Sequence, residues 1–284
     1  MSHIKTTAGD LILDCTVHVL DKGFVRLVDY MGGDDRIVQA ARVAYGKGTK
    51  STSEDAALID YLMRHRHTSP FEQVEFAFHM KLPIFCARQI VRHRTASLNE
   101  MSGRYSIMGS DMYLPLLERM MEQSSTNKQG SGNRLDLDVA TRLQDDMKED
   151  QDDAYSAYEC RIEDNLTREV ARINLPLSTY TEWYWKIDLH NLFHCLSLRM
   201  DPHAQWETRQ YANAMWGMVK AVCPIAAKSF ETHVLNAATF TADEFRHLKK
   251  YLNTGETGYT GTMHKEFVDK MIRLNKDKDW MTLK

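Results

Sequence analysis

The sequence predicts a single α+β domain in which a mainly antiparallel sheet is flanked by long helices. Two observations lead to this prediction. Residues 16–29 and 73–82 alternate apolar and polar side chains, a pattern typical of half-buried strands. Residues 53–64 place apolar side chains at helical spacing, and a long acidic stretch over 136–167 also suits a helix.

The elements before residue 95 follow from local signals. Residues 16–29 read as a hairpin around the turn Asp21-Lys22-Gly23, and 35–43 as a helix. Candidate Ser and Thr caps precede the amphipathic helix 53–64, and a strand over 73–82 follows. Pro83 is suited to open the next helix, which we expect to run into Arg94. On such a helix Gln89, Arg92 and His93 would share one face.

The second half of the chain is predicted to be mostly helical. Residues 123–132 are polar and rich in Gly and Ser, which predicts a mobile insertion inside one domain. After the long helix over 136–167, shorter helices are expected over 188–197, 202–222 and 226–235. Residues 242–284 form a polar, lysine-rich tail. The whole chain, 1–284, is predicted to be one catalytic domain.

Composition narrows the class of protein. A chain of 284 residues with 43% hydrophobic and 26% charged residues can bury a sizeable core. Its net charge of −3 argues against a general nucleic-acid binder. We expect no membrane span and no signal peptide, and therefore a cytoplasmic protein. The five cysteines are widely spaced without a Cys-x-x-Cys pair, which favours reduced, mostly buried thiols over disulfides or a zinc site.

Residues 92–106 concentrate the polar chemistry of the chain. Arg92, His93 and Arg94 stand in a row, and Ser102, Gly103 and Arg104 follow after seven intervening residues. Arginine forks and free backbone N–H groups at a Ser-Gly turn together fit a phosphate.

The same segment resembles the signature of flavin-dependent thymidylate synthases, in which Arg-His-Arg is followed after seven residues by Ser. Three other segments resemble that family in the same order: 65–72, 168–177 and 198–207. Together the four span about residues 41–224, whereas the tail from 242 has no match to the family. The resemblance implies the fold of that family.

The resemblance also implies site residues. Residues expected at the flavin are His67, Ser69, Arg92, His93, Arg94, Glu100, Asp188, His190, His194 and His203. Residues expected at dUMP are Gln89, Arg92, Glu100, Met101, Ser102, Gly103, Arg104, Arg172 and Arg199. Arg199 is the residue expected to activate the uracil ring. Between 188 and 194 this chain departs from the family pattern, because histidines stand where arginine and asparagine often contact the flavin.

The implied reaction is the reductive methylation of dUMP to dTMP. Methylenetetrahydrofolate would give the carbon, NADPH the reducing equivalents, and bound FAD would carry the hydride. The partners are therefore dUMP, folate and NADPH, with neither nucleic acid nor a membrane. A homotetramer with active sites shared between subunits is also implied.

Other interpretations of the same residues remain. The arginines could form a solvated helix end, and Ser102 could be a nucleophile, although no Gly-x-Ser-x-Gly elbow surrounds it. His65 and His67, with His79 further along, could hold a metal, but the chain lacks a His-Glu-x-x-His arrangement, and we expect no metal. The rival functions are a nucleotide- or RNA-binding protein without catalysis and a metal-dependent phosphohydrolase.

Overall fold

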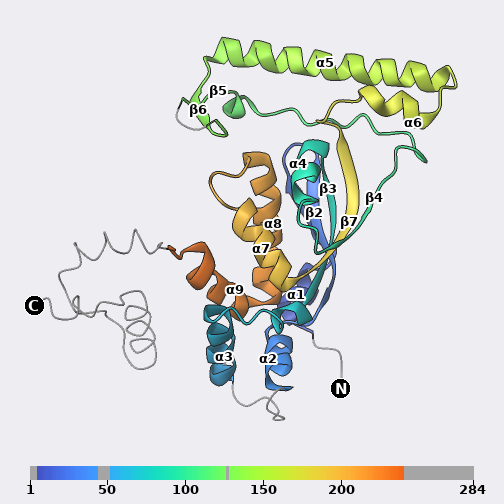
Figure 1. The fold of residues 1–284 in the computed structure, drawn as a ribbon. Helices are drawn as coiled ribbons and strands as arrows, with labels where there is room; N and C mark the ends of the chain where they lie inside the picture. The colour runs from blue at the N-terminus through green and yellow to red at the C-terminus, as the bar shows by residue number, and fades with distance from the viewer. Residues whose placement is uncertain (1–4, 44–51, 126–127, 240–284) are drawn as a thin grey trace, which may run out of the picture. The chain divides into compact units, whose positions relative to one another are not determined.

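The computed structural model describes residues 5–43, 52–125 and 128–239 (Figure 1). The chain divides into two units, Met1–Leu235 and Asn236–Lys284, of which the second contributes only residues 236–239 to the described part. The tail expected from residue 242 lies outside the described residues. That the whole chain is one catalytic domain stays a prediction.

The first unit combines helices with two antiparallel sheets. The strands are β1 (Thr16–Val19), β2 (Gly23–Met31), β3 (Glu75–Pro83), β4 (Ser97–Glu100), β5 (Met121–Gln123), β6 (Ser131–Arg134) and β7 (Tyr180–Asp188). The α-helices are α1 (Thr7–Ile12), α2 (Asp34–Arg42), α3 (Thr52–Arg64), α4 (Ile84–Ile90), α5 (Leu137–Glu163), α6 (Arg168–Ala171), α7 (Leu189–Arg199), α8 (Trp206–Val222) and α9 (Pro224–Phe230). Short helical turns are η2 (Phe71–Gln73), η3 (Leu117–Arg119), η4 (Arg172–Asn174) and the π-helical η5 (Glu231–Leu235).

The main sheet has the strand order β1-β2-β3-β7-β4, and every neighbouring pair is antiparallel. The predicted α+β class and antiparallel sheet are therefore confirmed. Inward residues of β3 face those of β7 across the ladder, with Phe78 opposite Trp185 and Met80 opposite Trp183. All four side chains are buried. Helices α7 and α8 lie along this sheet and complete the core with Phe193 and Trp216 (Figure 1).

Two strands of this sheet were not predicted from the sequence. β7 carries Trp183, Tyr184 and Trp185 in succession, so both of its faces are aromatic and the period of two is masked. β4 is exposed at all four residues and offers no hydrophobic pattern. Backbone pairing with β7 holds it at the edge of the sheet.

Two helices end earlier than the sequence predicts. α4 stops at Ile90, so the single helical face expected for Gln89, Arg92 and His93 is wrong. The chain turns there because the His93 N–H bonds back to the Ile90 carbonyl over 3.0 Å, and it then enters β4. α5 ends at Glu163 rather than 167, since Asn165 adopts the left-handed conformation with φ 63°. The Leu166 N–H reaches the Arg161 carbonyl, which completes a Schellman cap.

The segment predicted as a mobile insertion lies in the β5–β6 hairpin, and residues 126–127 of it are outside the described part. Its mobility stays a prediction. None of the described helices is both long and apolar enough to cross a membrane.

Candidate active site

Arg199, the last residue of α7, is held by two hydrogen bonds from a segment more than 100 positions away. Its Nε–H donates to Nε2 of His93 over 3.1 Å, and Nη2 donates to the Gln89 carbonyl over 2.9 Å. That carbonyl belongs to the last turn of α4. Carbonyl groups in the last turn of a helix lack intrahelical N–H donors, so a cation is favoured there. The structure thus brings together three residues predicted from the sequence.

His93 is half-buried and lies against α7, which carries both Arg199 and His194. Its ring meets that of His194 edge to face, with centroids 5.8 Å apart. Burial, then the charges of Arg199 and His194, lowers the pKa of His93 to about 4. The imidazole is therefore neutral at pH 7, as an acceptor of the Arg199 N–H must be.

Arg92 and Arg94 flank His93 and are both exposed. Neither forms a hydrogen bond or ion pair with any residue that the structure describes. They precede β4, whose first residue, Ser97, lies opposite Lys186 of β7. Two exposed cations just past the end of α4 are thus available to an anionic ligand, and a solvated helix end remains the alternative interpretation.

The other half of the signature forms a turn beyond the opposite end of β4. The Tyr105 and Ser106 N–H groups both bond to the Ser102 carbonyl at 3.0 Å, and the Arg104 N–H bonds to Ser102 Oγ. Arg104 pairs with Glu169 at 3.0 Å, and both side chains are more than half exposed. Ser102 has no histidine or carboxylate bonded to it in the described residues, so nothing there would activate it as a nucleophile.

Gly103 contacts the second arginine segment. A Cβ at this glycine would lie 3.0 Å from Cδ of Arg172 and 2.7 Å from Sδ of Met108. Arg172 itself is half-buried in η4, and its side chain has no hydrogen bond or ion pair among the described residues. Its sequence neighbours Val170 and Ile173 are exposed.

The two halves of the signature do not converge within one chain. β4 separates the segment 92–94 from the turn 102–104, and its four residues alone span roughly 13 Å at the usual rise per residue. Glu100, at the end of β4, accepts a hydrogen bond from the buried Thr181 over 2.6 Å. Met101, which follows it, continues the pairing with β7 through a bond to the Glu182 carbonyl.

The remaining residues expected at the flavin lie near the ends of α3 and α7. His67 follows the Schellman cap of α3, in which Arg66 has φ 58° and the His67 N–H bonds to the Leu62 carbonyl. His67 and Ser69 are both exposed. Asp188 caps α7, because its carboxylate accepts from the backbone and side-chain N–H groups of Asn191.

The histidines of α7 and its following turn differ in their surroundings. His190 is half-buried and His194 is exposed on α7. His203 is exposed and its Nδ1 lies 2.8 Å from Asp201. His79 instead lies in the sheet, where it bonds to Arg26 and Glu182. No group of three or more metal-ligating side chains is formed by the residues that the structure describes.

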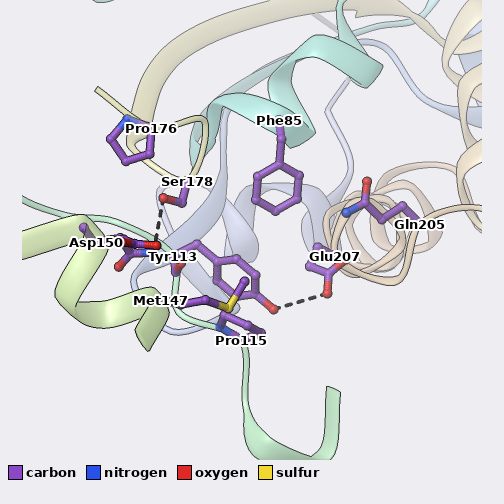
Figure 2. A pocket seen from close by; sticks show the side chains of 10 residues that line it. Phe85, Tyr113, Pro115, Met147, Asp150, Pro176, Ser178, Gln205 and Glu207 are labelled. Atoms are coloured by element: carbon purple, nitrogen blue, oxygen red, sulfur yellow. Dashed lines mark hydrogen bonds between the residues drawn. The ribbon is translucent and has the colours of Figure 1, made fainter. Parts of the chain in front are cut away.

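A pocket of about 400 Å³ is lined by residues of α4, α5 and α8, and Tyr113 points across it at Glu207 (Figure 2). None of the site residues predicted from the sequence lines it. Gln205 connects it to them, since its side-chain oxygen accepts a hydrogen bond from Gln89. Glu207 is buried and pairs with Arg119 at 3.2 Å. Gln205 and Glu207 were not predicted as site residues, although they lie in the segment 198–207 that resembles the family.

The cysteines divide into two kinds. Cys86, Cys195 and Cys223 are buried, as expected, whereas Cys15 and Cys160 are exposed. Burial raises the pKa of Cys86 and of Cys195 to about 12, so both remain thiols at neutral pH.

Comparison with known proteins decides the family. Residues 26–225 match the family described as "Thymidylate synthase complementing protein". The "Flavin-dependent thymidylate synthase" of Treponema denticola is 54% identical over 260 residues, which cover 91% of this chain and 98% of that protein. The chain belongs to the flavin-dependent thymidylate synthase family. The resemblance noted over residues 41–224 is therefore confirmed and begins earlier in the chain. The expectation that the tail 242–284 has no match to the family is wrong, because an alignment that covers 91% of the chain includes part of that tail.

Other members of the flavin-dependent thymidylate synthase family agree. The enzyme of that name from one strain of Thermus thermophilus is 53% identical over 264 residues, covering 90% of this chain and 96% of that protein. A crystal structure of the UMP/dUMP methylase PolB from Streptomyces cacaoi bound with 5-Br dUMP superposes with a TM-score of 0.71. It is 29% identical and covers 77% of this chain and 99% of that chain. This solved structure confirms the fold predicted by resemblance.

Proposed function

We propose that this protein methylates dUMP reductively to dTMP, with methylenetetrahydrofolate as the carbon donor, NADPH as the reductant and FAD as the bound cofactor. The observation that carries the proposal is the fixed guanidinium of Arg199. Two of the five N–H donors of an arginine are committed to His93 and Gln89, which leaves three for a ligand. Family membership supports the same reaction.

The described residues fit an anionic dinucleotide such as FAD. Arg92 and Arg94 are exposed cations without partners in the described chain, and guanidinium forks suit a pyrophosphate. His67, Ser69, His190 and His194 add hydrogen-bonding groups to the proposed site. When bound, FAD would supply the hydride chemistry that no side chain can perform.

The chain's own residues bind and orient the nucleotide in this proposal. The turn 102–104 presents backbone N–H groups, and Arg104 and Arg172 offer charge to the phosphate. Gln89, Glu100 and Met101 contribute further contacts. Arg199 then stabilises the negative charge that builds up in the uracil ring when its carbon 5 is methylated, as preorganised donors do in other enzymes.

A homotetramer with shared active sites explains why β4 separates the two halves of the signature. Apolar side chains beside the turn 102–104 are exposed, among them Tyr105 at 78% and Ile173 at 70%. Exposed apolar side chains next to binding residues are typical of a protein interface. A second copy could therefore cover them and bring Arg172 of one subunit to Arg199 of the other. A cytoplasmic location, expected from the sequence, belongs to the same proposal.

The reaction is tested directly on the purified protein. We expect a yellow protein with flavin absorbance, NADPH oxidation that depends on dUMP and folate, and dTMP as the product. UMP in place of dUMP tests the choice of nucleotide. A colourless protein that binds dUMP without consuming NADPH would contradict the proposal and favour a binding protein.

Subunit sharing is tested by mixing two inactive variants. Arg172→Ala and Arg199→Ala are each expected to lose activity. If one site draws these residues from two chains, co-refolded mixed oligomers contain some fully wild-type sites and recover activity. If each site lies within one chain, mixing restores nothing and the sharing is wrong.

A further inference from the structure

The contact between His93 and Arg199 requires one protonation state of the histidine. The Arg199 Nε–H points at Nε2 of His93 over 3.1 Å. An arginine nitrogen can only donate, so Nε2 must offer a lone pair. Of the forms that a histidine can take, only the neutral ring with its proton on Nδ1 does so.

The other two protonation states of His93 would break its hydrogen bond with Arg199. With the proton on Nε2, two N–H groups would face each other. A doubly protonated ring would do the same and would add a second positive charge beside Arg199. The groups facing His93 are Arg199 and His194 of α7, and Arg92 and Arg94 adjoin it in the chain. No carboxylate is hydrogen-bonded to the ring within the described residues.

We infer that His93 is a positioning residue, which holds the guanidinium of Arg199 in place by accepting its Nε–H as a neutral ring. The backbone supports this role, because the His93 N–H is itself fixed to the Ile90 carbonyl over 3.0 Å. Gln89 fixes the other side of the same guanidinium through its carbonyl. The inference rests on the proposed function, since it assumes that Arg199 acts on the uracil ring.

Two hydrogen bonds, to His93 and to the Gln89 carbonyl, fix the plane of the Arg199 guanidinium. A guanidinium bound through Nε and Nη2 cannot rotate about its long side chain, so its remaining N–H groups keep one direction. Without the His93 acceptor only the Gln89 carbonyl remains, and the side chain regains rotational freedom. Turnover should then fall more than nucleotide affinity, because orientation matters most in the transition state.

Two substitutions separate this role from simple packing. In His93→Gln the amide oxygen can replace Nε2 as an acceptor, whereas His93→Leu keeps the bulk and accepts nothing. We expect kcat per flavin-loaded site to fall roughly tenfold or more in His93→Leu, the effect of losing a charge-assisted hydrogen bond. His93→Gln should recover most of it, and KM for dUMP should change little in either. His18→Gln, at an exposed position of β1, is the matched control.

Nitrogen NMR of the ¹⁵N-histidine-labelled protein provides a readout besides activity. At pH 7 the His93 ring should be neutral with its proton on Nδ1, and Arg199→Ala should relax that preference. Normal kcat in a flavin-loaded His93→Leu, or a proton on Nε2 in the wild type, would overturn the inference. If instead the wild type forms no dTMP, the proposed function fails, while the NMR result still decides whether His93 accepts from Arg199.

Discussion

Gly103 lies so close to Arg172 that a Cβ at this position would come within 3.0 Å of the arginine Cδ. The distance is tighter than ordinary van der Waals contact, and Met108 Sδ is closer still at 2.7 Å. The glycine therefore lets the turn 102–104 approach the stem of Arg172, and the two segments depend on each other for their positions.

Gly103→Ala should weaken nucleotide binding. The methyl group must displace Arg172, Met108 or the turn itself, so KM for dUMP should rise about tenfold, which corresponds to ~1.4 kcal/mol. Gly109→Ala is the matched control, because a Cβ there meets nothing within 4 Å. Equal KM values for the two variants would show that the contact does not matter to the nucleotide.

Arg92→Ala and Arg94→Ala should each lower the affinity for FAD. Each loses a charge-assisted hydrogen bond worth roughly 1.5–3 kcal/mol. Flavin titration of the apoprotein measures the change. Arg88→Ala serves as the control, since Arg88 is also exposed but lies within α4 and outside the proposed site. Wild-type flavin affinity in both variants would refute the assignment.

No cysteine should be needed for the reaction. At neutral pH Cys86 and Cys195 are thiols because burial raises their pKa values to about 12, and the pKa of Cys223 is raised well above its ordinary value for the same reason. Alkylation of the exposed Cys15 and Cys160, and single Cys→Ala changes at the buried sites, should leave dTMP formation measurable. A well-folded variant without activity would contradict this expectation.

His93 should make stability depend on pH below neutrality. Its pKa is lowered to about 4 in the folded protein, against about 6.5 in an unfolded chain. Between these values the unfolded chain binds more protons, so this contribution is fully present above pH 6.5 and is lost as the pH falls towards 4. The urea midpoint of the wild type should therefore drop more between pH 7 and pH 5 than that of His93→Gln. Parallel curves would show that the pKa of His93 is not shifted.

Local patterns were enough to predict the hairpin of β1 and β2, the strand β3 and most helices. They failed for β7, where Trp183, Tyr184 and Trp185 stand in succession and hide the alternation. They failed also for β4, whose four residues are exposed and carry no hydrophobic pattern, and which pairs with β7 through its backbone.

The site could be predicted as segments but not as contacts. The sequence places His93 and Arg199 in different segments, and only the fold brings them together over a separation of 106 residues. The position of Gln205 against Gln89 likewise depends on how α8 meets α4. Such contacts leave no periodic signal, because they are made by long-range packing.

Arg199→Ala measures the central claim most directly. With saturating dUMP and flavin-loaded protein, turnover should fall roughly 100-fold or more, as is common when one preorganised electrostatic group is removed. Arg199→Lys should recover little, because a point charge cannot donate to both His93 and Gln89 in a fixed plane. Normal turnover in Arg199→Ala with only a raised KM would contradict the account and reduce Arg199 to a binding residue.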